Sequence, residues 1–218
     1  MGSDNEALDE RGLPVIDKGK KGGSITTTIV VIGATTAISI GAAFAIHHIG
    51  DSASFASKLE LIKSIDGQWI YASAWLFSKL SQTLNMIPTS FKEKIMTSKS
   101  GNLRANMILY KSLVPKDKSL IGMETEGDVG EYNRSNRSLH HFVESSLGFV
   151  MGFSLAAYVY PKPTFYAMGV YCFGRVLHQV GYAKGYGSHG TGFALSILAS
   201  TLIDGINLFV AGKSFGYF

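Results

Sequence analysis

The chain has 218 residues, of which 46% are hydrophobic and only 17% are charged, and its formal net charge at pH 7 is +4. Soluble domains carry about 25% charged residues, and disordered chains combine low hydrophobicity with high charge, so neither class fits. The single cysteine, Cys172, excludes an intrachain disulfide framework. The small, scattered positive charge indicates no nucleic-acid partner. The composition therefore indicates a membrane protein, with the lipid bilayer as its first partner.

Residues 1–24 form a polar tail, and the stretch 25–46 that follows contains no Lys, Arg, Asp, Glu or His. Roughly 20 apolar residues in a helix cross the hydrocarbon core of a bilayer. This run is too long, and lies too far behind the start of the chain, to be the apolar part of a signal peptide. We therefore expect a first transmembrane helix within residues 25–49.

Residues 50–130 are interpreted as an inserted loop between the first and second spans. Within it, Trp69, Leu76 and Leu84 share one helical face, which predicts an amphipathic helix that ends before Pro88. Three environments suit such a helix: the membrane interface, a partner protein, or the core of a small soluble subdomain. The sequence leaves the choice open.

Three further apolar stretches lie in the last 80 residues, at 142–160, 163–182 and 191–210. Only two residues join the first two of them, so these two must form an antiparallel hairpin. We expect an all-α integral membrane protein with four transmembrane helices and a long helical insertion between the first and second spans. Twelve of the 20 Lys and Arg residues lie in the segment 47–140, which predicts that the loop is cytosolic or in the matrix, with both termini opposite.

Two sets of polar residues each share one helical face: Arg137, His141 and Glu144 at the start of the second span, and Arg175, His178 and Tyr182 at the end of the third. Ionisable groups inside membrane helices are costly and indicate a functional site by default. The antiparallel hairpin brings both sets to the same side of the membrane. Together they suit a small, charged, hydrophilic ligand, and the alternative is a structural ion pair that only fixes helix register.

Two motifs carry a resemblance to a known family. The run YNRSNRSLHHFVE at 132–144 resembles the FNCxQRAHQNxxE signature of the MAPEG family, the membrane-associated proteins in eicosanoid and glutathione metabolism. The run GRVLHQVGYAKG at 174–185 is similar to that family's GRVLYxxGYxxG motif. The resemblance covers roughly residues 130–210 and is closest to the microsomal glutathione S-transferase 3 type.

The resemblance implies a four-helix protomer in a homotrimer, with glutathione bound between protomers. It implies that Arg137 contacts a glutathione carboxylate, that Glu144 holds the amino group, and that Tyr182 belongs to the same site. Arg175 matches the third-helix arginine of the motif. His141 stands where the family has asparagine, and His178 where many members have tyrosine. These six residues are the predicted glutathione-binding set.

The family's catalytic arginine should follow Tyr182, but residues 183–191 read AKGYGSHGT and contain no arginine. His189 and Lys184 lie nearest and are the candidate, though doubtful, catalytic residues. Histidine, with a reference pKa near 6.5, is a weaker support for a thiolate than arginine. The predicted insertion also makes the loop after the first span much longer than the family's.

Two functions follow from this pattern. One is a repurposed family member with a remodelled glutathione site, serving as a structural or accessory subunit of a larger membrane complex. The other is an active glutathione S-transferase or peroxidase acting on lipophilic electrophiles or lipid hydroperoxides. A haem or metal protein using His140, His141, His178 and His189 is a third reading. The mitochondrial inner membrane and the endoplasmic reticulum are both compatible locations.

Overall fold

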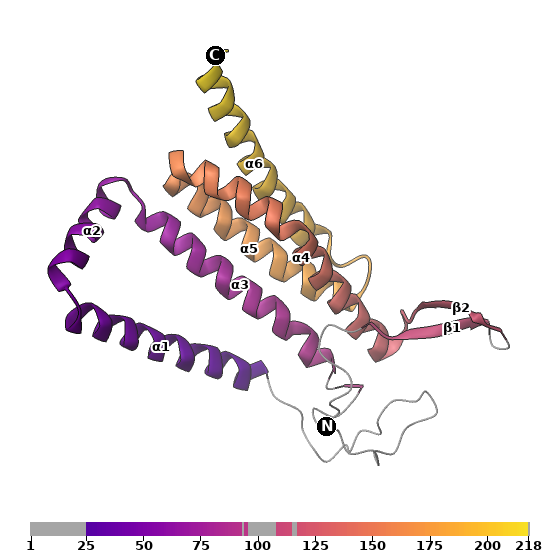
Figure 1. Ribbon diagram of the computed structural model, residues 1–218. Coiled ribbons are helices and arrows are strands. Elements are labelled where there is room, and N and C mark those ends of the chain that lie inside the picture. Colours follow the sequence, from indigo (N-terminus) through magenta and orange to yellow (C-terminus); the bar gives the residue numbers. More distant parts are fainter. Residues whose placement is uncertain (1–24, 93, 96–107, 115–116, 218) are drawn as a thin grey trace.

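The computed structural model describes residues 25–92, 94–95, 108–114 and 117–217, which form six helices and one two-stranded sheet (Figure 1). In chain order the elements are α1 (Ile25–Ile49), α2 (Ser52–Ser64), α3 (Gln68–Lys92), β1 (Tyr110–Val114), β2 (Asp117–Met123), α4 (Gly127–Val159), α5 (Pro161–Lys184) and α6 (Gly190–Phe215). The predicted all-α membrane architecture is confirmed, with a short β-hairpin added to it.

Helices α3, α4, α5 and α6 form one bundle in which α5 packs against the other three (Figure 1). Trp69 at the start of α3 contacts Phe165 near the start of α5, with ring centroids 5.1 Å apart. Phe77 further along α3 contacts Phe142 and Phe149 of α4. Helix α3 therefore runs parallel to α5 and antiparallel to α4, so each consecutive pair within the bundle is antiparallel.

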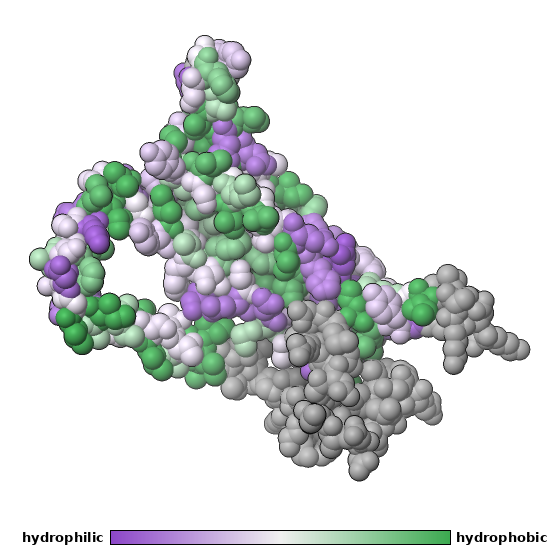
Figure 2. Space-filling view, in the orientation of Figure 1, coloured by the Kyte–Doolittle hydropathy of each residue, from purple (hydrophilic) through white to green (hydrophobic). Residues whose placement is uncertain are grey.

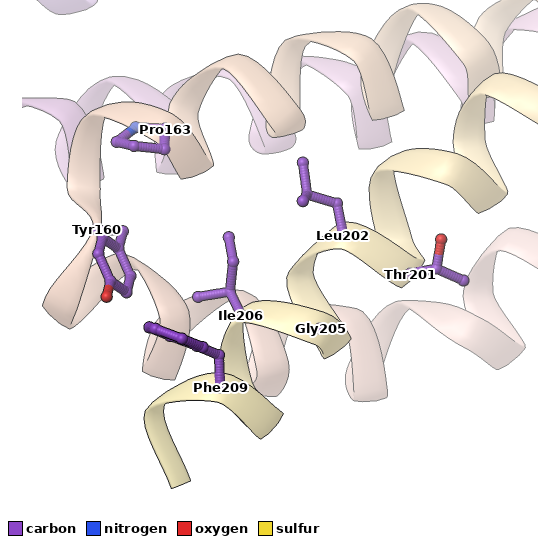
Figure 3. A pocket seen from close by; sticks show the side chains of 7 residues that line it. All are labelled: Tyr160, Pro163, Thr201, Leu202, Gly205, Ile206 and Phe209. Atoms are coloured by element: carbon purple, nitrogen blue, oxygen red, sulfur yellow. The ribbon is translucent and has the colours of Figure 1, made fainter. Parts of the chain in front are cut away.

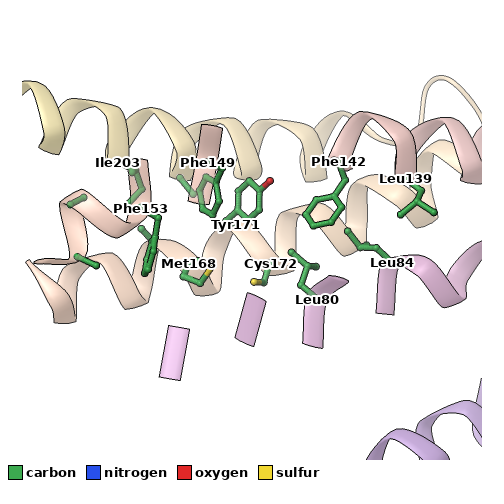
Figure 4. Packing of buried hydrophobic residues seen from close by; sticks show 14 residues of the cluster. Leu80, Leu84, Leu139, Phe142, Phe149, Phe153, Met168, Tyr171, Cys172 and Ile203 are labelled. Carbon is green, nitrogen blue, oxygen red and sulfur yellow. The ribbon is translucent and has the colours of Figure 1, made fainter. Parts of the chain in front are cut away.

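The core of the bundle is a set of buried apolar side chains drawn from all four helices (Figure 4). Phe149 of α4 stacks on Tyr171 of α5, with centroids 3.8 Å apart and ring planes 10° from parallel. Leu80 and Leu84 enter from α3 and Ile203 from α6, and all three are at most 4% exposed. Burial of these side chains holds the bundle together, at ~1.5–3 kcal/mol for each large one.

Helices α5 and α6 approach each other closely because glycines lie at their crossing. A Cβ atom on Gly192 of α6 would lie 2.3 Å from the backbone nitrogen of His178, and one on Gly174 of α5 would lie 2.7 Å from the backbone nitrogen of Ser196. No larger side chain fits at either position without moving the backbone. The close crossing fixes the start of α6, and the loop before it, against the polar end of α5.

The first helix of the bundle differs from the sequence-based expectation. The expected amphipathic helix is present as α3, and its surroundings, which the sequence left open, are those of a bundle helix packed against α4 and α5. It also continues through Pro88 to Lys92 instead of ending before the proline, because a side chain of α5 pairs with the carbonyl that Pro88 leaves free. The face predicted to be apolar, with Leu80 and Leu84, is the one buried against α4 and α5.

Helices α1 and α2 stand apart from the bundle as an arm. Helix α1 packs mainly against α2, and no residue of the apolar window within Val30–Ile49 is buried. The space-filling view shows an opening between this arm and α3, and apolar side chains cover α1 (Figure 2). The predicted first span is therefore present as a helix, but its side chains face outward.

Within the part of the chain that the structure describes, three helices are long and apolar enough to cross a membrane, within α1, α4 and α6. The fourth expected span forms α5, but it is not among these three. The physical reason lies in its polar side chains Arg175, His178 and Gln179, each at most 5% exposed. They lower the hydropathy of α5 yet face the interior of the bundle, where they do not meet lipid.

Candidate functional site

The hairpin of α4 and α5 brings the two predicted polar sets together. The Oγ of Ser138 lies 2.9 Å from Nδ1 of His178. Arg175 contacts Nδ1 of His141 through Nη1 at 3.2 Å, and its Nη2 donates to the carbonyl oxygen of Ser138 at 3.2 Å. Arg175 is 3% exposed, so a buried guanidinium joins α5 to the first half of α4.

Arg137 and Glu144 form an ion pair on the outer surface of α4, with Nη1 and Oε1 3.3 Å apart. Their side chains are 48% and 59% exposed. An exposed pair of this kind contributes little to stability. Both side chains are accessible from outside the protomer, with a cation and an anion side by side.

A second group consists of stacked rings at the end of α5 and the start of α6. His178 stacks on Tyr182 with centroids 5.6 Å apart, and His189 meets both rings edge-on at 5.4 and 5.0 Å. Phe193 of α6 closes the group at 5.6 Å from His178. Of the two candidate catalytic residues, His189 therefore joins the polar set, whereas Lys184 is exposed on the last turn of α5.

The loop between α5 and α6 carries His189 and folds back onto α5 at Gly181. A Cβ atom on Gly181 would lie 2.3 Å from the carbonyl oxygen of Ser188. Because the clash would be with backbone, it could be relieved only by moving the loop. The glycine at this position therefore sets how closely the imidazole of His189 approaches Tyr182.

Sequence reasoning missed Asn133 and Arg134, which tie the β-hairpin to the site. Both polar atoms of the Asn133 side-chain amide bond the backbone: its Oδ1 accepts from the nitrogen of Leu109, and its Nδ2 donates to the carbonyl of Glu124 at 2.8 Å. Arg134 is 8% exposed and donates from Nε to Ala183 at 2.9 Å. The sequence contains a signal for Arg134, because this arginine stands where the FNCxQRAHQNxxE signature has cysteine.

A cavity of about 350 Å³ opens between α4 and α6 beside this polar set. Its lining combines hydroxyl, imidazole, guanidinium and carboxylate groups with apolar rings: His141, Ser145, Gly148, Phe149, Tyr171, Arg175, Phe193, Ser196, Ile197, Ser200 and Asp204. The Nε of Arg175 is buried and has no hydrogen-bond partner among the described residues. A polar ligand in this cavity would lie beside a fixed cation.

A larger cavity of about 490 Å³ lies at the opposite end of the bundle, near the turn between α4 and α5 (Figure 3). Apolar side chains dominate its walls: Tyr160, Pro163, Thr201, Leu202, Gly205, Ile206 and Phe209. It lacks the ionisable groups that chemistry at a thiol needs. We therefore place the candidate functional site at the smaller cavity, despite the difference in volume.

Three of the four histidines considered for a metal lie close together: His141, His178 and His189. The ring centroids of His178 lie 6.1 Å from His141 and 5.4 Å from His189. Within the part of the chain that the structure describes, no group of three or more His, Cys, Asp or Glu side chains is arranged to hold a metal ion.

The fold and the site together define the class of protein. It is an integral membrane protein whose helices α4, α5 and α6 position ionisable groups at one end of the bundle. The sequence profile of the MAPEG family matches residues 69–209, from the second residue of α3 into α6. The chain belongs to the MAPEG family. No curated protein matches the sequence closely enough to count as a relative.

Proposed function

We propose that this MAPEG protein retains a remodelled glutathione site and serves as a structural or accessory subunit of a larger membrane complex. The observation that carries the proposal is the identity of the residue beside Tyr182. His189 occupies the ring cluster, and residues 183–191 contain no arginine. Histidine carries a full positive charge only in acid, whereas arginine is always charged.

The binding half of the site is supported by charge. Glutathione has two carboxylates, one ammonium group and a thiol. Arg137 and Glu144 offer an accessible cation and anion on α4, which match a carboxylate and the ammonium group. The guanidinium of Arg175, which lines the cavity, fits a second anionic or carbonyl group. His141 lines the same cavity, and His178 and Tyr182 belong to the ring cluster beside it.

The accessory role is supported by the arm of α1 and α2. The family match begins at residue 69, so both helices lie outside the family's shared region. An apolar helix with no buried side chain in its span window offers its whole surface to lipid or to other subunits. The assembly is proposed to be either a homotrimer or a set of subunits in a larger complex, in the mitochondrial inner membrane or the endoplasmic reticulum.

The second candidate is an active glutathione S-transferase or peroxidase. It is favoured by the convergence of Arg175, His178, Tyr182 and His189 at one end of the bundle. In this case His189 would support the glutathione thiolate, which is the true nucleophile, and the lipophilic partner would enter from the bilayer. Lys184 would act only if the end of α5 rotated it inward.

The deciding experiment extracts the protein from its own membrane in mild detergent and measures its native mass and glutathione turnover together. Comigration with a much larger complex, and no turnover, would support the accessory role and identify the membrane through the partners. A free species of three 23.5 kDa chains with turnover would establish the enzyme instead. Both candidate functions include the glutathione site, and titration with labelled glutathione tests it.

A further inference from the structure

Helix α2 carries an uncovered apolar face at the corner between α1 and the bundle. We propose that α2 lies flat at the boundary of the bilayer and binds anionic phospholipids there. Phe55, Leu59 and Ile62 lie among the acyl chains. Lys58 and Lys63 lie beside the lipid phosphates. This inference does not rest on the glutathione site, because α2 precedes residues 69–209, which match the family.

The position of α2 in the chain places it at the end of a membrane span. The apolar window Val30–Ile49 of α1 has 20 residues, which extend about 30 Å as a helix, the thickness of the hydrocarbon core. Helix α2 begins at Ser52, directly after this window, and turns away from the axis of α1 (Figure 1). A helix that follows a complete span and changes direction there lies at the boundary between hydrocarbon and water.

The start of α3, at the other end of α2, marks the same boundary. The ring of Trp69 lies 6.2 Å from that of Tyr166, and Nζ of Lys162 lies 5.7 Å from the Trp69 centroid. Tryptophan and tyrosine concentrate at the level of the lipid headgroups, and lysine side chains extend from the apolar region toward water. Both ends of α2 are therefore joined to residues at headgroup level.

Close contacts at the two ends of α2 fix which of its faces points toward the hydrocarbon. A Cβ on Gly50 would lie 2.6 Å from the ring of Phe55, and one on Gly67 would lie 3.1 Å from Cγ2 of Ile62. Gly50 precedes α2 on the side of α1, and Gly67 follows it on the side of α3. The ring of Phe55 also lies 6.0 Å from that of His47 in the last turn of α1. The face shared by Phe55 and Ile62 therefore points toward the two spans.

The side chains around this face are distributed as in an interfacial helix. At about 100° per residue, Leu59 lies beside Phe55 and Ile62 on one apolar arc. Lys58 and Lys63 flank the arc on its two sides. Their methylene stems can cover apolar surface there while the ammonium groups reach the headgroups. The opposite face consists of small and polar residues: Ala53, Ser57, Glu60 and Ser64.

The described part of the chain does not cover this apolar arc. No residue of α2 is buried against it, and Leu59 and Leu61 are 53% and 64% exposed. The apolar window of α1, which leads into α2, has no buried residue among those described either. The lipid that surrounds α1 therefore continues under α2. At this depth the bilayer supplies both acyl chains for the arc and phosphates for the two lysines, which matches the charge of the flanks.

Fluorescence quenching of the full-length protein in vesicles tests the position of α2. In a Cys172→Ala background, bimane is attached to Leu59→Cys or, as the matched control on the opposite face, to Ser57→Cys. Both residues are exposed, so neither label displaces a buried side chain. In vesicles of phosphatidylcholine and phosphatidylglycerol, doxyl-labelled lipid should quench the label on Leu59→Cys. Aqueous iodide should quench the label on Ser57→Cys instead.

A comparison of two quenching lipids tests the role of the lysines. Around the Leu59→Cys label, doxyl-phosphatidylglycerol should be enriched over doxyl-phosphatidylcholine by roughly 5-fold for each lysine. Lys58→Gln/Lys63→Gln should remove the enrichment, and the charge-preserving Lys58→Arg/Lys63→Arg should keep it. Quenching of the Leu59→Cys label by iodide would overturn the proposal, as would quenching by neither agent, which indicates a protein contact. An enrichment that persisted in the glutamine variant would overturn the assignment of the lysines to the phosphates.

Discussion

The side-chain amide of Gln179 in α5 donates a hydrogen bond to the backbone carbonyl of Leu84 in α3, with Nε2 and O 3.0 Å apart. Leu84 is four residues before Pro88, and proline has no N–H to pair with the carbonyl of residue i−4. The carbonyl is buried inside the bundle, where an unpaired polar group is costly. Gln179 therefore allows α3 to continue through its proline, and it joins α3 to α5 at the level of the candidate site.

The variant Gln179→Leu should lower the free energy of unfolding by about 1–3 kcal/mol, because the buried carbonyl of Leu84 would lose the donor that Gln179 supplies. Pro88→Ala restores the backbone N–H, so the double variant Gln179→Leu/Pro88→Ala should be more stable than Gln179→Leu alone. Thermal unfolding in detergent measures both. If the proline substitution gave no recovery, the hydrogen bond to Leu84 would not be the reason for the loss.

The residue that stands beside Tyr182 controls the proposed chemistry. His189→Arg should increase turnover of glutathione with a lipophilic electrophile by about 100-fold, the scale of one well-placed charge at an oxyanion or thiolate. Lys184→Arg is the matched control, since the side chain of Lys184 is exposed on the outside of α5, and it should change nothing. Steady-state kinetics and thiolate absorbance report the result.

Arg137→Ala should abolish glutathione binding both in the wild-type background and in the His189→Arg background, because Arg137 is the accessible cation of the proposed site. Isothermal titration with glutathione measures this. An exposed cation that takes no part in the site, Lys63 of α2, provides the control variant Lys63→Ala. If the affinity of Arg137→Ala for glutathione were unchanged, Arg137 would not belong to the glutathione site.

The direction of α3 predicts that α2 and the β-hairpin lie on opposite sides of the membrane. Cysteines introduced at Lys58 in α2 and at Tyr110 in β1, both exposed, should react with a membrane-impermeant reagent from opposite sides of sealed vesicles. Cys172 is buried and should stay silent. Labelling of both from one side would instead support a single long loop from 47 to 140.

The base of the β-hairpin should open in acid. Lys111 donates to Oε1 of Glu124 at 2.8 Å, and this bond lowers the pKa of Glu124 below its usual 4.5. A carboxyl whose pKa is lower in the folded state stabilises the fold above its unfolded pKa, and the stabilisation is lost as the pH falls through the folded value. Hydrogen exchange of β1 and β2, corrected for intrinsic rates, should therefore accelerate below about pH 4.5.

Glu124→Gln should show fast exchange in β1 and β2 already at neutral pH and little further change in acid. Glu126→Gln, at an exposed neighbouring carboxyl, should behave like the wild type. Acceleration in acid that persisted in Glu124→Gln would assign the opening to another group.

The sequence predicted the polar faces of α4 and α5 better than the helix that completes the bundle. Spacing along α4 and α5 placed Arg137, Glu144, Arg175 and His178 on defined faces, because a helix repeats every 3.6 residues whatever surrounds it. The sequence predicted α3 as an amphipathic helix but left its surroundings open, since its apolar face looks the same whether it meets lipid, a partner or α5. Hydropathy instead favours the stretch that forms α1 as the first transmembrane helix, and that helix stands apart from the bundle.

The remaining features depend on contacts between distant residues. The bonds of Asn133 to the β-hairpin join residues 24 and 9 positions apart, and no local pattern predicts them. Helix α4 also begins at Gly127, well before its apolar part. Val129 and Tyr132 in its first turns are buried against Phe91, Ile95 and Leu109 rather than by lipid. Periodicity therefore defines the faces of helices, and tertiary packing selects which of them meet.

Helix α4, with 33 residues, is about 50 Å long, whereas the hydrocarbon core of a bilayer is about 30 Å thick. The excess lies on the side of the β-hairpin, where the polar first half of the helix begins. Arg137, His141 and Arg175 therefore lie near the boundary between water and lipid. In the enzyme that is the second proposed function, a hydrophilic thiol would reach them from the aqueous phase while a lipophilic compound would approach sideways from the bilayer. The length of one helix would then bring two substances that do not mix to one place.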